Sequence, residues 1–214
     1  MFSKILVLAP HTDDGELGCG GAISKLLECG ADVYYVAFSV AEESVPHGFP
    51  KNILETELRK AIDVLGIPKQ NLIIYRYGVR TFSYHRQEIL ENMIHLRREL
   101  QPDLIFMPSL NDLHQDHKVV AEEGVRAFKK FTILGYEEPW NNIIFRTVSF
   151  ITLEKRHIEK KINALNCYET QKYRAYLDKE FIKSLAKTRG TQIEVEFAEA
   201  FEVVRWVIRC TRIK

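Results

Sequence analysis

Two short clusters of histidine and aspartate stand out in this sequence because their side chains could bind a metal ion together. The first, at 11–14, reads His-Thr-Asp-Asp and directly follows the apolar run 4–10. The second, at 114–117, reads His-Gln-Asp-His and follows the apolar run 103–109. Two imidazoles and one carboxylate suit Zn²⁺ and leave a fourth position for water. The same donors would also accept Fe²⁺ or Co²⁺.

A metal site of this kind indicates hydrolysis. A bound divalent ion acidifies water toward neutral pH and makes it a usable nucleophile. The two adjacent aspartates have different roles available, because one can bind the metal while its neighbour accepts a proton from the water. Each cluster alone also fits a simpler interpretation, since an Asp pair after a strand is often a helix cap and a His-x-x-His pair is often surface decoration. Their joint occurrence at two predicted strand ends favours a functional site.

The pattern of apolar residues predicts the elements that position these clusters. Near-continuous apolar runs are typical of strands covered on both faces, and they lie at 4–10, 32–40, 71–77 and 103–109, with later candidates at 147–153 and 201–209. Helical spacing of apolar residues lies between them, at 21–29, 54–65 and 87–100, and again at about 157–168. The alternation predicts an α/β fold with a mainly parallel sheet and helices on both faces. Since parallel strands end at one edge of a sheet, both clusters are expected there.

The composition is typical of one globular domain. The 214 residues, 46% hydrophobic and 28% charged, suit a single α/β domain over 1–214. The net charge of +1 gives no reason to expect nucleic acid as a partner. No apolar stretch has the length of a membrane span, and the first apolar run meets Asp13 too soon for a signal peptide. The four scattered cysteines indicate a reduced, cytoplasmic protein.

The glycines that follow the first cluster allow a second interpretation. The segment Gly18–Gly21 partly matches a dinucleotide-binding loop. Asp13, Asp14 and Glu16 would crowd the place of the pyrophosphate and repel it. The glycines are therefore expected to let the start of a helix pack close to the sheet.

Several segments resemble the PIG-L/LmbE-like deacetylases. PHTDDGELGCGG (10–21) is similar to the family motif AHPDDE-x-LGCGG, and HQDH (114–117) is similar to the motif HPDH. KINALNCYETQ (161–171), TRG (188–190) and FAEAF (197–201) resemble further family segments, so the similarity covers nearly the whole chain. The resemblance implies a Rossmann-like fold, a homo-oligomer, and zinc-dependent removal of an N-acetyl group from a sugar conjugate.

The resemblance also implies a role for each residue of the two clusters. Carried over by position, the zinc ligands would be His11, Asp14 and His117. Asp13 would be the general base. A protonated His114, oriented by Asp116, would stabilise the oxyanion and assist the leaving amine. These protonation states predict a bell-shaped pH profile.

The sequence departs from the family pattern at a few positions. Thr12 and Gln115 replace the usual prolines, and the usual Glu is displaced by one position to Glu16. These changes leave the implied ligands and base intact. A substrate-binding arginine is common in the family, but Leu54 stands about where it is expected. Trp140 is expected either to line a pocket or simply to pack.

Two other functional classes remain open. A nucleotide-binding transferase that uses Gly18–Gly21 would bind nucleotide even after metal chelation. A metal-binding module without turnover would hold zinc and release no acetate. The sequence identifies neither the sugar nor the group attached to it.

Overall fold

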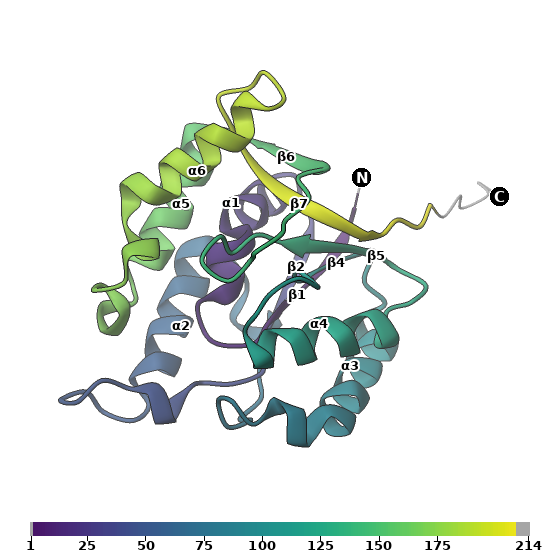
Figure 1. Cartoon of the computed structure of the whole chain (residues 1–214), viewed down its shortest axis with the longest axis vertical. Coiled ribbons are helices and arrows are strands. Elements are labelled where there is room, and N and C mark those ends of the chain that lie inside the picture. Colours follow the sequence, from purple (N-terminus) through teal and green to yellow (C-terminus); the bar gives the residue numbers. More distant parts are fainter. Residues whose placement is uncertain (1, 209–214) are drawn as a thin grey trace.

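The computed structural model describes residues 2–208, which form a seven-stranded sheet with helices on both faces (Figure 1). The strands, in their order across the sheet, are β3 (Leu72–Ile74), β2 (Asp32–Ala37), β1 (Lys4–Ala9), β4 (Leu104–Pro108), β5 (Thr132–Tyr136), β7 (Phe197–Arg205) and β6 (Ser149–Leu153). The first five are parallel, and β7 runs antiparallel to both of its neighbours. The predicted α/β fold with a mainly parallel sheet is confirmed.

The helices form two layers. In chain order they are α1 (Asp14–Glu28), α2 (Ile53–Leu65), α3 (Arg86–Leu100), α4 (Gln115–Ala127), α5 (Lys155–Leu165) and α6 (Lys179–Thr191). Short 3₁₀ helices lie at Glu42–Ser44, Lys69–Asn71, Phe82–His85, Glu169–Gln171 and Ala175–Leu177. Along β1, Ile5 and Val7 pack in the layer of α1, α2 and α5, whereas Leu6 and Leu8 pack in the layer of α3 and α4. Burial on both faces explains why this strand is apolar from Ile5 to Ala9.

Most of the predicted elements are present. The apolar runs at 4–10, 32–40, 103–109 and 147–153 correspond to β1, β2, β4 and β6. The helices predicted at 54–65 and 87–100 correspond to α2 and α3. The run at 71–77 forms only the short strand β3, and the helix expected at about 157–168 ends at Leu165. The structure contains no helix among residues 2–208 that could cross a membrane.

Other boundaries differ from the prediction. The helix predicted at 21–29 begins at Asp14, directly after the first cluster. The strand predicted at 201–209 begins earlier, at Phe197. The buried Glu199 interrupts the apolar pattern there and concealed the first residues of the strand. Residue 209 lies outside the described residues. The apolar pattern did not predict β5, α4 and α6. Polar residues interrupt the apolar pattern in both helices, and β5 is a short run.

Helix α1 is broken at Cys19, where the backbone leaves helical geometry (φ −146°, ψ 22°). The N–H groups of Gly21 and Ala22 donate instead to the carboxylate of Glu199, at 3.0 and 2.7 Å. The Nζ of Lys161 binds the same carboxylate at 2.7 Å and donates to a backbone carbonyl before the break at 2.6 Å. A buried ion pair therefore replaces the helical hydrogen bonds that the break removes.

The strand order places a crevice where the two predicted clusters lie. From β1 the sheet continues to β2 on one side and to β4 on the other. Ligands of open α/β sheets bind outside the carboxyl ends of the strands at such a reversal. The first cluster follows β1 and the second follows β4, so the fold brings them to one crevice.

Candidate functional site

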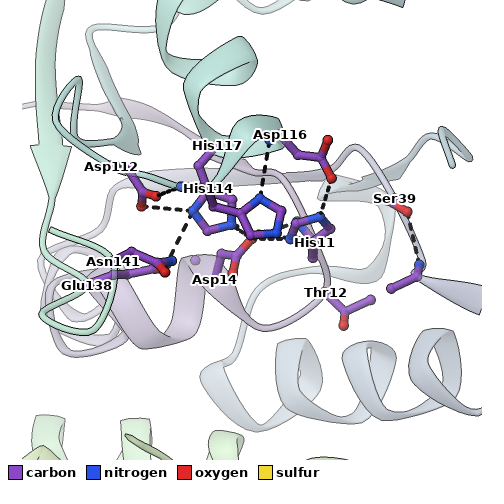
Figure 2. Close-up of polar contacts among 12 residues, drawn as sticks. His11, Thr12, Asp14, Ser39, Asp112, His114, Asp116, His117, Glu138 and Asn141 are labelled. Atoms are coloured by element: carbon purple, nitrogen blue, oxygen red, sulfur yellow. Dashed lines mark hydrogen bonds and ion pairs between the residues drawn. The ribbon is translucent and has the colours of Figure 1, made fainter. Parts of the chain in front are cut away.

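The two clusters meet at the carboxyl ends of β1 and β4 (Figure 2). His11 follows β1 in the loop that leads to α1, and Asp14 is the first residue of that helix. His117 lies in the first turn of α4. His117 and Asp14 are buried, and His11 is half-buried.

Three donor atoms from these residues form a nearly equilateral triangle. Nδ1 of His11 lies 3.2 Å from Oδ2 of Asp14 and 3.3 Å from Nε2 of His117. The third side, from Nε2 of His117 to Oδ2 of Asp14, is 3.3 Å. A tetrahedral zinc ion with bonds of ~2.0 Å separates its ligands by about 3.3 Å. The triangle therefore has the size of one face of a zinc coordination tetrahedron.

Each histidine of the triangle is held by a carboxylate on its other nitrogen. Oδ2 of Asp116 lies 3.1 Å from Nε2 of His11, and Oδ2 of Asp112 lies 2.9 Å from Nδ1 of His117. Carboxylates in this position fix the orientation and tautomer of ligand histidines in metal sites. The sequence analysis missed Asp112, although it precedes His117 by five residues and His114 by two.

Asp14 supplies the negative charge of the triangle. Burial raises the pKa of the Asp14 carboxyl, but the charges of His117 and His11 outweigh it and hold that pKa well below its ordinary value. Asp14 is therefore an anion, and one of its oxygens also accepts the backbone N–H of His11 at 2.7 Å.

Asp13 lies beside the triangle and lines the same pocket. Burial and the charge of Asp14 raise the pKa of Asp13 to about 6, against the opposing charges of His11 and Arg174. A carboxylate with this pKa is ionised at neutral pH yet remains basic enough to accept a proton. Its side chain makes no cap for α1, so the helix-cap interpretation does not account for this residue.

His114 also lines the pocket, but its protonation differs from the expectation. Its Nδ1 accepts the backbone N–H of Asp116 at 3.2 Å, which leaves the proton of a neutral ring on Nε2. Burial and the charges of His117 and His11 lower the pKa of His114 to about 4. This pKa favours a neutral ring at pH 7 over the protonated His114 that the resemblance implies, so the catalytic role of His114 stays a prediction. The Asp116 carboxylate contacts His11, so only the backbone of Asp116 orients His114.

A second buried carboxylate faces His117. Oε2 of Glu138 lies 3.6 Å from Nδ1 of His117 and accepts an N–H of Asn141 at 3.1 Å. Oε1 of Glu138 is buried and has no hydrogen-bond partner among the described residues. Burial, together with the charge of Asp14, raises the pKa of Glu138 well above its ordinary value. The sequence analysis missed this residue, since a Glu-Glu-Pro stretch carries no metal-site spacing.

The triangle opens into a cavity of about 210 Å³. Trp140 lines its wall and stacks on Tyr176 with ring centroids 4.2 Å apart, so it both packs and contributes to the pocket. Leu54 also lines the pocket at the position expected for an arginine. Arg174, which sequence reasoning did not identify, lies on the same wall.

The glycine segment packs against the sheet. A Cβ on Gly18 would lie 2.3 Å from the ring of Tyr136, and one on Gly21 would lie 2.6 Å from Leu153. Below this turn, the buried carboxyl of Glu16 accepts hydrogen bonds from the hydroxyls of Tyr35 and Tyr168. The close packing accounts for the small residues without a nucleotide, as the sequence analysis expected.

Comparison with known proteins links this site to characterised relatives. Residues 6–128, which include both clusters, match the family described as PIG-L: GlcNAc-PI de-N-acetylase. A diacetylchitobiose deacetylase of Thermococcus kodakarensis is 29% identical over 133 residues, which are 58% of this chain and 48% of that protein. The chain therefore spans about half the length of this relative.

Solved structures share the fold. A diacetylchitobiose deacetylase from Pyrococcus horikoshii superposes with a TM-score of 0.78 and 21% identity over 95% of this chain and 84% of the other. A 4-carboxy-2-hydroxymuconate hydratase from Pseudomonas putida KT2440 superposes with a TM-score of 0.75 and 19% identity over 98% and 99%. These two proteins differ in reaction, so the fold alone does not decide the chemistry.

Proposed function

Since this chain belongs to the PIG-L family of GlcNAc-PI de-N-acetylases, we propose that it is a zinc-dependent hydrolase that removes an N-acetyl group from an amino-sugar conjugate and releases acetate. The observation that carries the proposal is the triangle formed by His11, Asp14 and His117, which opens into a pocket with Asp13 and His114 beside it. The name of the Thermococcus relative indicates N-acetylated sugars as the substrate class.

Zinc is the ion that the donor set favours, because two imidazoles and one carboxylate with an open fourth position are typical of catalytic zinc sites. Bound there, the ion would acidify water and polarise the amide carbonyl. The remaining steps belong to the side chains around it.

Asp13 is the proposed general base. Its carboxylate takes a proton from the attacking water and then passes it to the leaving amine. Neutral His114 donates its Nε2 hydrogen to the oxyanion that forms on the carbonyl oxygen. This assignment does not require a charged imidazole, and it agrees with the low pKa of His114.

Elemental analysis coupled to acetate release tests the proposal. Protein prepared without chelator should contain about one divalent ion per chain. It should release acetate from N-acetylglucosamine, N,N'-diacetylchitobiose or a nucleotide-linked N-acetyl sugar, and chelation should abolish the release until zinc is restored. His117→Ala should lose metal and acetate release together, and Lys172→Gln, a change outside the pocket, should lose neither.

The same experiment separates the alternatives. Metal retained without acetate release from any substrate would support a binding module. Nucleotide binding that survives chelation would support a transferase. Consumption of an unsaturated carboxylic acid without acetate would indicate the reaction named for the Pseudomonas neighbour.

Two finer parts of the proposal concern the surroundings of the protein. We place it in the cytoplasm, where the cysteines at 19, 29 and 167 remain thiols. We also expect a homo-oligomer, to which the exposed side chains of Leu113, Ile143 and Ile144 would contribute apolar contact area. Fractionation and light scattering test these two parts.

A further inference from the structure

Arg174 is the only arginine or lysine among the described residues that line the metal pocket. The other ionisable residues that line it are the three carboxylic acids Asp13, Asp14 and Glu138, three histidines and one tyrosine. The family resemblance suggests an arginine near Leu54, and this chain places its cation on a different segment. Arg174 thus places a positive charge in a pocket that three carboxylic acids line.

A chain of hydrogen bonds fixes the guanidinium in place. Buried Glu57 accepts both the backbone N–H of Thr170 (3.1 Å) and its hydroxyl (2.6 Å). The hydroxyl of Thr170 in turn accepts the amide of Gln171 at 3.3 Å. The side-chain oxygen Oε1 of Gln171 accepts the Nε–H of Arg174. The orientation of Arg174 is therefore set from inside the protein, from helix α2.

Aromatic rings restrict the guanidinium further. Its carbon lies 5.6 Å from the ring centroid of Tyr176 and 5.3 Å from that of Tyr173. Tyr176 is itself stacked on Trp140. Across the described residues, the Arg174 guanidinium has no carboxylate within ion-pair distance, and its one side-chain hydrogen bond uses Nε. Its terminal N–H groups thus remain available to a ligand.

We propose that Arg174 binds an anionic group, a carboxylate or a phosphate, that the substrate carries in addition to its N-acetyl group. The proposal rests on the proposed function for the N-acetyl part of that substrate. A pre-oriented guanidinium with free terminal nitrogens is suited to bidentate binding of these two anions. It also supplies the positive charge that such a substrate needs beside Asp13 and Glu138.

The charge of Arg174 also lowers the pKa of Asp13, which is a second effect to be separated from anion binding. If Arg174 acted only through Asp13, its replacement would slow all substrates alike. If it binds an anion, its replacement would weaken anionic ligands and leave neutral ones unchanged. The two roles therefore differ in a measurable way.

Equilibrium binding tests the proposal without relying on turnover. Calorimetry would compare N-acetylglucosamine, its 1-phosphate and its carboxymethyl glycoside on zinc-loaded protein that carries Asp13→Asn. An anionic probe should bind about 10–100-fold more tightly than the neutral sugar. Arg174→Gln in the same background should remove that advantage. The phosphate and carboxylate probes distinguish the two anions.

Lys172→Gln is the matched control. This exposed lysine pairs with Glu169 and does not line the pocket. Its substitution removes the same positive charge two positions away from Arg174. It should keep the preference for the anionic probe. Competition by inorganic phosphate is a second control. An anion that binds only at the metal would displace the anionic sugar equally well from the protein with Arg174 and from Arg174→Gln.

The proposal is overturned if Arg174→Gln keeps the anionic advantage, or if it weakens neutral and anionic probes equally at an unchanged melting temperature. It is also overturned if no anionic probe binds better than the neutral sugar. Failure of the proposed function is a separate outcome, namely charge-dependent binding through Arg174 with no acetate released by the wild-type protein.

Discussion

Oδ2 of Asp116 lies 3.1 Å from Nε2 of His11, on the nitrogen opposite the one that faces Asp14. Replacing this carboxylate should loosen the ring and weaken its metal bond. Asp116→Asn should reduce zinc affinity by about 10–100-fold, and so should Asp112→Asn at His117. Competition with a chelating dye measures the affinity. Asp178→Asn, which changes the cap of α6 away from the site, is the control and should bind zinc like wild type.

The two neighbouring aspartates should respond differently to substitution. Asp14 belongs to the triangle, so Asp14→Ala should lose zinc and activity together. Asp13 is outside the triangle, so Asp13→Asn should keep zinc and melting temperature while kcat falls by ~10²–10⁴-fold. Zinc content, melting temperature and kcat are measured for both variants. Loss of zinc from Asp13→Asn but not from Asp14→Ala would refute the assignment.

The pH profile should have a rising limb without a falling limb from His114. Asp13 must be ionised to act as a base, so kcat/KM should rise with pH along a limb at or below about pH 6, the pKa of its carboxyl without a bound cation. A bound cation would move this limb to lower pH. His114 is already neutral above about pH 4, so His114→Ala should lower kcat by ~10²–10³-fold and leave the limb in place. A falling limb that disappears in His114→Ala would restore the protonated role.

The buried carboxyl of Glu16 should make the folded state less stable as pH rises. Burial raises its pKa from 4.5 to about 8, against the opposing hydrogen bonds of Tyr35 and Tyr168. The folded chain therefore keeps a proton that the unfolded chain releases between these values, and stability falls with pH across this window. Glu16→Gln lacks this titration. Its melting temperature relative to wild type should increase from pH 5 to pH 8, and a constant difference would contradict the prediction.

The close packing of Gly18 gives a test of the glycine segment. A Cβ on Gly18 would lie 2.3 Å from the ring of Tyr136, whereas one on Gly20 would lie 3.0 Å from the side chain of Lys161, a milder overlap. Gly18→Ala should destabilise the fold by about 1–3 kcal/mol, and Gly20→Ala by less. Denaturant unfolding measures both. Equal stability of Gly18→Ala and wild type would mean that packing does not explain this glycine.

The sequence predicted the elements whose residues face the core on both sides. The continuous apolar runs of β1 and β4 identify buried parallel strands, and their ends locate both clusters. Helix α4 begins within the second cluster at Gln115, where chemically required polar residues replace an apolar start. The spacing of apolar residues therefore did not predict α4, the helix that carries His117.

The site residues that were not predicted lie near the triangle in the folded chain but belong to no sequence motif. Glu138 follows β5, and Arg174 lies in the segment before α6. Glu138 reaches the pocket because β5 lies beside β4, and Arg174 because hydrogen bonds tie its segment to α2. No local sequence pattern encodes either contact. The protonation of His114 likewise depends on its burial and, besides the nearby His117, on His11, which is distant in sequence. Only the folded arrangement reveals these relationships.

His11 and His117 lie 106 positions apart in the sequence, yet their ring nitrogens are 3.3 Å apart. An ion held between them would therefore act as a removable cross-link between the loop after β1 and the first turn of α4. A ligand that binds only the folded chain stabilises it by about 4 kcal/mol when its free concentration is a thousand times its dissociation constant. The metal supply of the cell would then set the lifetime of the folded chain against proteolysis as well as its catalytic rate.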